Sequence, residues 1–337
     1  MRVLHIANFS LAKHGNIFYS TDRKLSAGFV RNGHHVYDIS DRDMARCMTP
    51  FNSKKLGRKK MNEAVLQTAS NLQPDLILLG HTNLLYESTL DALRSRVRHA
   101  RIAQWFVDPL FLPQVREHLF QRLPHLDAFF CTTGGDWLDP FRKVNANCHY
   151  LPNPVDEGVE SLKNHEKRDF DNDLVYVGSD HKDPKRRQML QKLLDHPQQL
   201  RFALYASLGK PRVFGAEYLD VLARSKMGLN LSRRSDIPYY SSDRIAQLTG
   251  NGLLTFIPET PGLRSLFDEG EVVYFERTAE LFDKAIYYLN HDDERQEIAR
   301  KGWERAHRSY ATDRVARFIT EATFELPLGE AYEWLDA

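Results

Sequence analysis

Short apolar runs alternate with helical patterns along most of this sequence, and this alternation restricts the fold more than any other feature. The first series opens with an apolar run at residues 2–8, a helical pattern over Ser20–Asn32 and a second run at 34–40. A strand, a helix and a strand in this order predict a parallel pair with a right-handed crossover. Further strands are predicted at 75–81, 100–108 and 127–133, and further helices near 62–72 and 88–96.

The alternation stops at Leu151–Asp156, where two prolines in three residues disfavour both a helix and a central strand. We expect a linker here, running through the polar stretch to Asn172. The alternation then resumes, with strands predicted at 173–179, 200–206, 227–232, 252–258 and 272–276, and helices at 184–194, 216–224, 244–249 and 279–290. Two charged amphipathic helices are predicted over 292–324.

The two series predict an α/β protein made of two Rossmann-like doubly wound domains that face each other across a cleft. We expect an N-terminal domain over 1–153, a C-terminal domain over 154–310, and a helix and tail over 311–337 that could pack back on the first domain. The length of 337 residues agrees with roughly two domains of about 150 residues each.

The charge is balanced overall and divided unequally. The chain has 46 Lys+Arg and 45 Asp+Glu, yet residues 1–150 carry a net +7 and the remainder a net −6. A basic first half could meet an anionic membrane or acceptor, and Lys54–Lys60 would be its most basic point. The alternative is that this run is a solvated loop. No nucleic-acid partner is expected.

The expected location is the cytoplasm, possibly at the inner face of a membrane. The apolar runs are much shorter than the roughly 18 residues that a membrane-spanning helix needs. Three cysteines without metal-like spacing favour a reducing compartment, and the first residues do not resemble a secretion signal.

In doubly wound sheets, ligands bind beyond the carboxyl ends of the strands, so residues at those positions are the candidates for chemistry. Asp108 follows an apolar strand and is the first choice for a catalytic base, although an Asp before Pro109 is equally typical of a turn. His14 and His81, which follow the strands at 2–8 and 75–81, are the second and third candidates. Each histidine could instead be structural.

In the second series, the segment after the strand at 173–179 predicts an anion site. Gly178 and Ser179 allow close backbone approach, and Pro184 suits a first helical turn. Four cations lie beside this predicted helix start: Lys182, Lys185, Arg186 and Arg187. Together with free backbone N–H groups they would neutralise a diphosphate. The alternative is an exposed basic first turn.

A second predicted helix start lies at Arg244, preceded by the loop Tyr240, Ser241, Ser242 and Asp243. Its N-terminus would direct backbone donors into the cleft. The first strand lacks a following G-x-G-x-x-G, which disfavours a nicotinamide cofactor.

These segments carry a family resemblance. The stretch Ser225–Glu276, which includes SSDRIAQLTGNGLLTF and ETPGLRSLFDEGEVVYFE, resembles the C-terminal domain of nucleotide-sugar glycosyltransferases of the GT-B fold. It is most similar to the group-1-type branch that includes spore-maturation-protein-like enzymes. The similarity continues through residues 287–311. LPNPVD resembles the interdomain linker of that family, and WFVDP resembles one of its N-terminal strands.

The resemblance implies roles for individual residues. Arg244 and the loop from Tyr240 to Asp243 would approach the donor diphosphate, and Lys185 or Arg186 would hold the same phosphates. Gln247 replaces a glutamate that binds the ribose in many members, and Tyr239 replaces a second glutamate of retaining members. The donor nucleotide and the stereochemical outcome therefore stay open.

The function implied is transfer of a sugar from a nucleotide-sugar donor to a glycan or lipid-linked acceptor, in cell-surface polysaccharide or lipopolysaccharide synthesis. No cofactor and no metal are expected, because the two Asp-x-Asp triplets, Asp41–Asp43 and Asp171–Asp173, lie outside the predicted diphosphate pocket. A nucleotide-sugar epimerase of the same fold and a catalytically silent sugar-binding protein are the alternatives.

Overall fold

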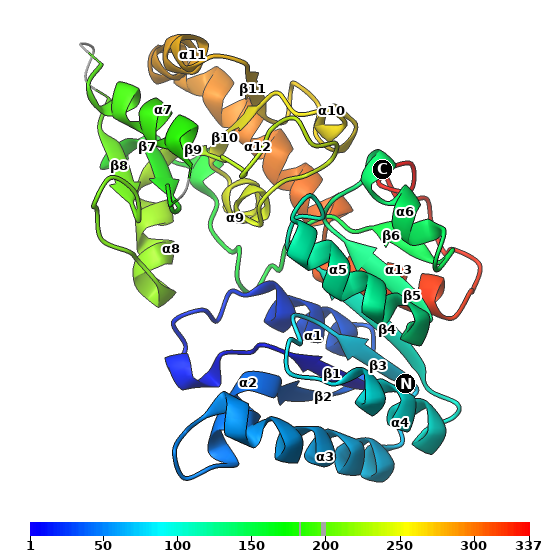
Figure 1. Ribbon diagram of the computed structural model, residues 1–337. Coiled ribbons are helices and arrows are strands. Elements are labelled where there is room, and N and C mark those ends of the chain that lie inside the picture. The colour runs from blue at the N-terminus through cyan, green and yellow to red at the C-terminus, as the bar shows by residue number, and fades with distance from the viewer. Residues whose placement is uncertain (182, 197–199) are drawn as a thin grey trace. The chain divides into compact units, whose positions relative to one another are not determined.

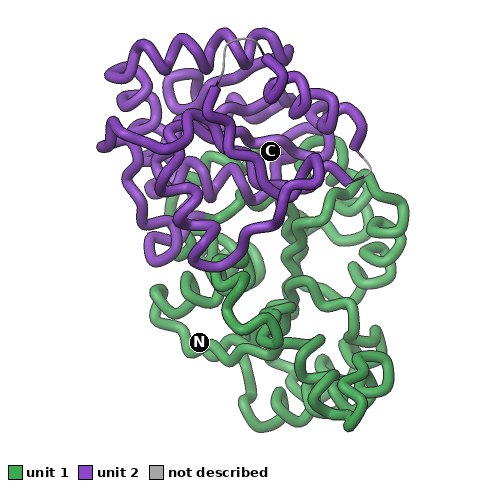
Figure 2. Tube along the Cα trace, turned by 90° about the vertical axis from the view of Figure 1, so that its left-hand side faces the viewer, with its two compact units in different colours: residues 1–154, 312–337 green, residues 155–311 purple. Residues whose placement is uncertain are grey.

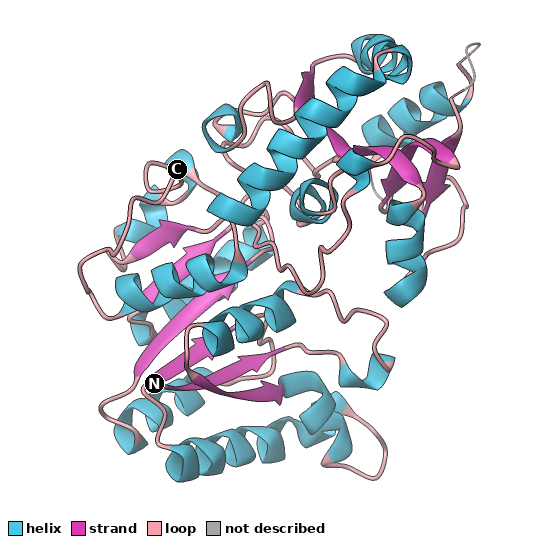
Figure 3. Ribbon diagram, turned by 180° about the vertical axis from the view of Figure 1, so that it is seen from behind, coloured by secondary structure: helices cyan, strands magenta, loops and turns pink. Residues whose placement is uncertain are grey.

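The computed structural model describes residues 1–181, 183–196 and 200–337, so the predicted cation Lys182 lies outside the described residues. The chain forms two compact units (Figure 2). Unit 1 contains Met1–Pro154 and Thr312–Ala337, and unit 2 contains Val155–Ala311. Each unit holds a parallel sheet covered by helices, which confirms the predicted class of two Rossmann-like α/β folds (Figure 3).

The sheet of unit 1 has six parallel strands in the order β2-β1-β3-β4-β5-β6 (Figure 1). Helices lie on both faces, which explains why strands such as β3 are apolar throughout and fully buried. The strands are β1 (Arg2–Ala7), β2 (His35–Ser40), β3 (Leu76–Leu79), β4 (Arg101–Phe106), β5 (Ala128–Cys131) and β6 (Cys148–Tyr150).

The helices of unit 1 divide between the two faces of this sheet. Helices α1 and α13 pack against each other, and Gly28 permits this because a Cβ there would lie 2.2 Å from the carbonyl oxygen of Thr312. Helices α2, α3 and α4 pack together along the other face. The α-helices are α1 (Thr21–Arg31), α2 (Asp41–Cys47), α3 (Lys54–Leu72), α4 (Glu87–Arg96), α5 (Pro113–Arg122), α6 (Asp139–Arg142) and α13 (Thr312–Thr323).

Helix α3 begins at Lys54, so the prediction of a start near residue 62 was wrong, as was the interpretation of Lys54–Lys60 as a loop. Ser53 caps the helix by accepting a hydrogen bond from the backbone N–H of Leu56 (3.4 Å). Gly57 packs against α2, where a Cβ would lie 1.8 Å from the carbonyl oxygen of Ala45. These contacts stabilise a lysine-rich first turn that the sequence alone disfavours.

Unit 2 holds a five-stranded parallel sheet in the order β11-β10-β9-β7-β8. Its strands are β7 (Asn172–Val177), β8 (Phe202–Tyr205), β9 (Ser225–Leu229), β10 (Leu254–Pro258) and β11 (Val273–Phe275). Its α-helices are α7 (Pro184–Leu194), α8 (Gly215–Ala223), α9 (Arg244–Gly250), α10 (Leu263–Leu266), α11 (Thr278–Asn290) and α12 (Asp292–Ser309). The core joins all five strands to α7 and α11, with Tyr176, Phe256 and Phe282 among its largest members.

Much of the expected linker is an ordered part of unit 2. Val155 bridges to Ala311, and the buried Asn164 donates to the carbonyl oxygens of Leu222 (2.8 Å) and Ser225 (3.0 Å). Polar composition suggested a solvated segment, but this asparagine satisfies buried backbone groups. Within the described residues, no helix is both long and apolar enough to cross a membrane.

Candidate functional site

The strand order of each sheet identifies where a ligand is expected. In unit 2, β7 is followed by β8 on one side and by β9 on the other, so the order reverses between β7 and β9. Ligands bind beyond the carboxyl ends of the strands at such a switch point. The loops at this point begin at Gly178 and at Asn230, and the first contains the predicted donor-binding residues Gly178 and Ser179.

Arg244, at the start of α9, connects the end of β7 to the loop after β9 through its guanidinium group. Its Nε donates to the carbonyl oxygen of Val177 (2.7 Å), and its Nη1 donates to that of Leu231 (3.1 Å). The group also lies 4.8 Å from the ring centre of Tyr176. Nη2 makes no hydrogen bond with the described residues and lies beside Gly178, where a Cβ would be 2.4 Å away. Arg244 therefore links the end of β7 to the loop after β9, and its Nη2 amino group is left to bind a ligand.

Arg186 also acts as a brace between the two loops. Its guanidinium donates to the carbonyl oxygens of Ser179 (2.6 Å) and Ser232 (2.7 Å) and pairs with Asp183 at 3.1 Å. Asp183 also caps α7 by accepting from the Arg186 backbone N–H (3.0 Å). Lys185, the other predicted phosphate-binding cation, is exposed. Its side-chain amino group makes no hydrogen bond or ion pair with the described part of the chain.

A serine and asparagine network fixes the loop before α9. Asn230 donates to Ser241 Oγ (2.9 Å) and accepts from Ser242 Oγ (3.0 Å), while the Ser242 N–H donates to Ser232 Oγ (3.0 Å). The neighbouring Tyr240 is buried. The network makes the predicted loop residues rigid, and it includes Asn230, which the sequence analysis had not singled out.

Gln247 faces α8 and lies in the protein interior. Its Oε1 accepts from the hydroxyl of Tyr218 (2.6 Å) and its Nε2 donates to Asp243 (3.3 Å). Both amide atoms therefore already have partners, and ribose binding by Gln247 stays a prediction. Tyr239 has φ 58 and packs over Gly262, where a Cβ would lie 2.7 Å from the ring.

A cavity of about 610 Å³ opens at the carboxyl edge of this sheet, a size suited to a small-molecule ligand. Two of its cations, Lys185 and Arg233, have no hydrogen-bond or ion-pair partner among the described residues. Arg234 pairs with Asp236, and Arg186 is engaged as above. The chemistry of the cavity is that of an anion site. Its lining includes Asp183, Lys185, Arg186, Ser232, Arg233, Arg234, Asp236 and Glu276.

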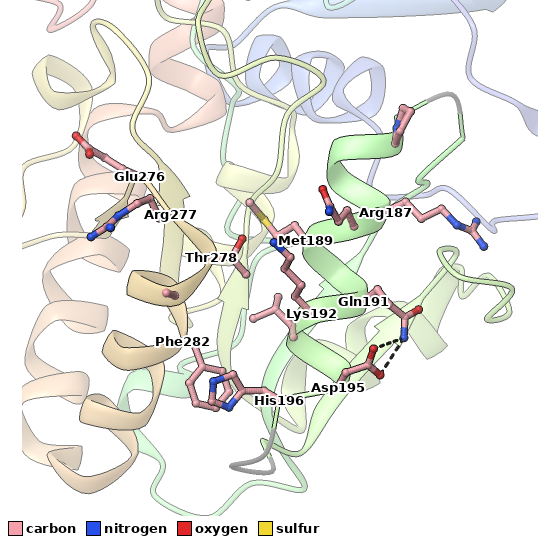
Figure 4. Close-up of a pocket in the computed structure, with 14 residues that line it drawn as sticks. Arg187, Met189, Gln191, Lys192, Asp195, His196, Glu276, Arg277, Thr278 and Phe282 are labelled. Carbon is pink, nitrogen blue, oxygen red and sulfur yellow. Dashed lines mark hydrogen bonds between the residues drawn. The ribbon is translucent and has the colours of Figure 1, made fainter.

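A larger cavity of about 1020 Å³ lies between α7 and α11 (Figure 4). Met189 occupies its centre, and His196 stacks on Phe282 at its far end. Gln191 and Asp195 hydrogen-bond to each other on α7 (2.9 Å). Because this cavity follows the helices away from the strand ends, we assign the ligand site to the smaller one.

In unit 1 the strand order reverses between β1 and β3, and the candidate bases follow these strands and β4. His81 Nε2 lies 3.1 Å from Asp108 Oδ2, so the structure brings two of the three candidates together. The imidazole also stacks on Phe106, with ring centres 5.0 Å apart. A carboxylate that orients an imidazole is a typical arrangement for accepting a proton.

The loop that carries His81 is held by three side chains. Arg122, which is fully buried, donates to Thr82 Oγ1 (2.8 Å) and to the Thr82 carbonyl oxygen (2.6 Å). Burial lowers the pKa of Arg122 to about 10. Arg58 and Asn62 both donate to the carbonyl oxygen of Leu84, at 2.8 and 2.9 Å. The loop is therefore preorganised.

His14, the remaining candidate, ends a short 3-10 helix after β1 with φ 49. It is exposed, and its side chain has no hydrogen bond or ion pair with the described residues. The structure does not show it in contact with the His81–Asp108 pair.

Two carboxyl groups of unit 1 are buried, Asp22 and Asp41, and the sequence analysis predicted the burial of neither. Asp22 lies in the first turn of α1, and its Oδ1 has no hydrogen-bond partner among the described residues. A Cβ on Gly80 would lie 2.4 Å from this oxygen. Burial, aided by the Asp41 carboxylate, raises the pKa of Asp22 to about 8, and burial raises the pKa of Asp41 to about 6. An acid in a first helical turn normally indicates only a favourable helix dipole, so the sequence held no signal for these shifts.

The two Asp-x-Asp triplets have structural partners. Asp43 accepts from the backbone N–H of Leu11 (2.6 Å) and pairs with Arg46 (3.0 Å). Asp173 accepts from Arg201 Nε at 3.1 Å.

Comparison with known proteins gives one match to a sequence family, in the C-terminal half of the chain. Residues 185–321 match the sequence model of a family described as glycosyl transferase-like. A search of curated proteins finds no match.

Solved structures with the same fold span nearly the whole chain. The Anabaena HepE structure with UDP and glucose has a TM-score of 0.61 and 13% identity, over 97% of this chain and 100% of that one. Sucrose-phosphate synthase from Thermosynechococcus elongatus has a TM-score of 0.62 and 12% identity, over 96% and 99%. Phage T4 β-glucosyltransferase has a TM-score of 0.55 and 13% identity, over 97% and 100%.

Proposed function

We propose that this chain, a glycosyltransferase of the GT-B fold, binds a nucleoside-diphosphate sugar in the carboxyl-edge cavity of unit 2 and transfers the sugar to a hydroxyl group of a glycan or lipid-linked acceptor. The family match in the C-terminal half and the fold support the enzyme class. The donor class, the acceptor and a role in cell-surface polysaccharide or lipopolysaccharide synthesis are the parts proposed.

The observation that carries the proposal is the pair of uncommitted cations, Lys185 and Arg233, in a cavity at the sheet's switch point. Nη2 of Arg244 faces Gly178 at the same sheet edge. A diphosphate leaving group develops negative charge as the glycosidic bond breaks, and fixed cations stabilise that charge. We therefore propose that transfer needs no metal ion.

UDP is the first nucleotide to test. The structurally similar HepE has been solved with UDP and with UDP-glucose. The cavity's cations are suited to the diphosphate, which all nucleoside-diphosphate sugars share.

The His81–Asp108 pair supplies the acid–base chemistry in this proposal. Asp108 accepts the Nε2 proton of His81, so Nδ1 is the atom that takes the acceptor's proton. The acceptor oxygen forms a bond to the anomeric carbon, the bond from that carbon to the phosphate oxygen breaks, and the nucleoside diphosphate leaves with the electron pair.

The test is incubation with UDP-, GDP- and ADP-sugars in the presence of EDTA, with released nucleoside diphosphate as the readout. We expect release with one nucleotide class, and also slow release to water without an acceptor. Release that depends strictly on a divalent cation would contradict metal independence. A change of the sugar's configuration without nucleotide release would indicate an epimerase. Neither turnover nor binding of any nucleotide would indicate a silent protein.

A further inference from the structure

The start of α3 in unit 1, together with the residues just before it, combines positive charge with exposed apolar side chains. Residues 54–60 contain five cations and no acid. Arg58 turns inward, where it bonds the loop after β3 and stacks on Tyr86 at 4.0 Å. The other cations and two apolar residues form an exposed set, named here the basic–apolar patch: Phe51, Lys54, Lys55, Leu56, Lys59 and Lys60.

The four lysines of the patch are not explained by contacts within the protein. None of their side-chain amino groups makes a hydrogen bond or ion pair with the residues that the structure describes. Lys54 and Lys55 occupy the first turn of a 19-residue helix, and this turn contains no acidic residue. Cations at this position oppose the helix dipole, so their clustering destabilises the isolated protein slightly.

The apolar members of the patch are unusually exposed. Phe51 is 78% exposed and Leu56 is 62% exposed, the highest values among the large hydrophobic side chains described. A soluble polyanion would be held by the lysines alone and would leave Phe51 and Leu56 in water. A lipid bilayer with anionic headgroups matches both components, because it accepts apolar side chains below a negatively charged surface.

The C-terminal segment of unit 1 reduces the positive charge of this unit. The segment 312–337 adds two arginines and six acidic residues, so the net charge of this unit is +3 compared with +7 for residues 1–150. That segment packs with α1, on the sheet face opposite α3 (Figures 1 and 3). The acidic segment therefore lies on the other side of the sheet from the helix that carries the patch.

The patch also adjoins the loop of the candidate base. Arg58, inside the patch's helical turn, donates to the carbonyl oxygens of Leu84 (2.8 Å) and Leu85 (3.2 Å). Those residues end the loop that begins with Gly80 and His81. A surface that touches the patch would thus present its headgroups near His81.

We propose that the basic–apolar patch docks unit 1 on an anionic membrane surface, with Phe51 and Leu56 inserted between the headgroups. This rests on the proposed function, because it identifies the acceptor as one presented at a bilayer within reach of His81. Docking gives the four lysines the negative partners that the protein does not supply.

The test is co-sedimentation with vesicles of phosphatidylcholine, with and without phosphatidylglycerol. We expect binding only to the vesicles that contain phosphatidylglycerol, and release at about 0.5 M salt, where the screening length is only several ångströms. Replacing the four lysines by glutamine should weaken binding by about 600-fold, since each lysine near an anionic surface contributes about fivefold. The double variant Phe51→Ser/Leu56→Ser should weaken it by about tenfold.

A matched control removes the same charge elsewhere on unit 1. Arg96, Arg98, Arg116 and Lys143 are exposed and have no side-chain partner among the described residues, and their replacement by glutamine should leave most of the binding. Equal losses of vesicle binding in the patch and control variants would overturn the proposal. Unchanged vesicle binding of the Phe51→Ser/Leu56→Ser variant would also overturn it, because that result indicates a soluble polyanion as the partner.

A separate readout distinguishes this proposal from the proposed function. UDP affinity and slow UDP-sugar hydrolysis should be unchanged in the patch variants. Vesicle binding without any nucleotide binding would support membrane docking and refute the proposed nucleotide-sugar donor. Nucleotide binding without vesicle binding would refute membrane docking and leave the proposed donor intact.

Discussion

The Nε2 atom of His81 lies 3.1 Å from Oδ2 of Asp108, although 26 residues separate the two side chains along the chain. Strands β3 and β4 are neighbours in the sheet, so the residues that follow them meet at one edge. The pair is placed by the sheet and by the rigid loop that Arg122 holds.

Replacing His81 by Gln should lower kcat by about 100-fold and leave nucleotide affinity unchanged, because general base catalysis contributes at least that factor. Asp108→Asn should lower kcat less, because it leaves the imidazole in place. The exposed His99 provides the control variant His99→Gln, which should retain full activity. A His81→Gln enzyme with wild-type kcat would refute this role. Steady-state kinetics with isothermal titration of UDP gives both quantities.

Arg244→Ala should affect stability as well as donor binding. The change leaves the carbonyl oxygens of Val177 and Leu231 without their donor, which should lower the free energy of unfolding by about 1–3 kcal/mol. Loss of the charge at Nη2 should weaken UDP binding by about 2 kcal/mol. Arg212→Ala, at an exposed arginine of the same unit, should change neither quantity. Unchanged UDP affinity would contradict the ligand role of Arg244, and unchanged denaturant stability would contradict its bracing role.

Gly178→Ala tests the close contact with Arg244 directly. The added Cβ would lie 2.4 Å from Nη2, so the guanidinium must shift, and we expect destabilisation of about 1–3 kcal/mol together with weaker UDP binding. Gly270 has open space around it, which makes Gly270→Ala a suitable control. Equal melting temperatures for the two variants would show that the site tolerates the displacement.

Asp22→Asn should change how stability depends on pH. The folded-state pKa of Asp22 is raised to about 8 by burial, so between pH 4 and 8 the folded chain keeps a proton that the unfolded chain releases. The wild type should therefore lose stability as pH rises from 5 to 8, by about 3–4 kcal/mol more than Asp22→Asn. Chemical denaturation at both pH values measures this difference. Parallel pH profiles, as expected for the exposed Asp136→Asn control, would mean that Asp22 titrates normally.

The alternation of strands and helices was sufficient to predict the fold class, since parallel strands covered on both faces are apolar throughout. The alternation did not predict the helix boundaries that depend on tertiary contacts. The start of α3 depends on the packing of Gly57 against α2, and the lysines around it resemble a loop. The short helix α2 and the helix α5 carry no strong apolar periodicity, and they were not predicted.

The candidate site was predictable in its position but not in its contacts. The residues at strand ends could be identified from the sequence, because parallel strands place them at one edge. The bonds of Arg244 to Val177 and Leu231 join segments 67 and 13 residues away, so no local pattern contains them. Arg233 is notable because its charge is exposed in the cavity, and Asp22 because its carboxyl group is buried. Both were missed, because the sequence does not show the exposure of a side chain.

Calorimetric titration of UDP into the wild type and into Lys185→Gln/Arg233→Gln tests the central claim most directly. Lys210→Gln/Arg212→Gln, which removes the same charge from an exposed loop of unit 2, is the matched control. Our account predicts that UDP binds the wild type and the control equally and binds the Lys185→Gln/Arg233→Gln variant at least about tenfold more weakly, as two lost charge-assisted contacts require. Equal affinity of all three proteins for UDP would contradict the assignment of the diphosphate to this cavity.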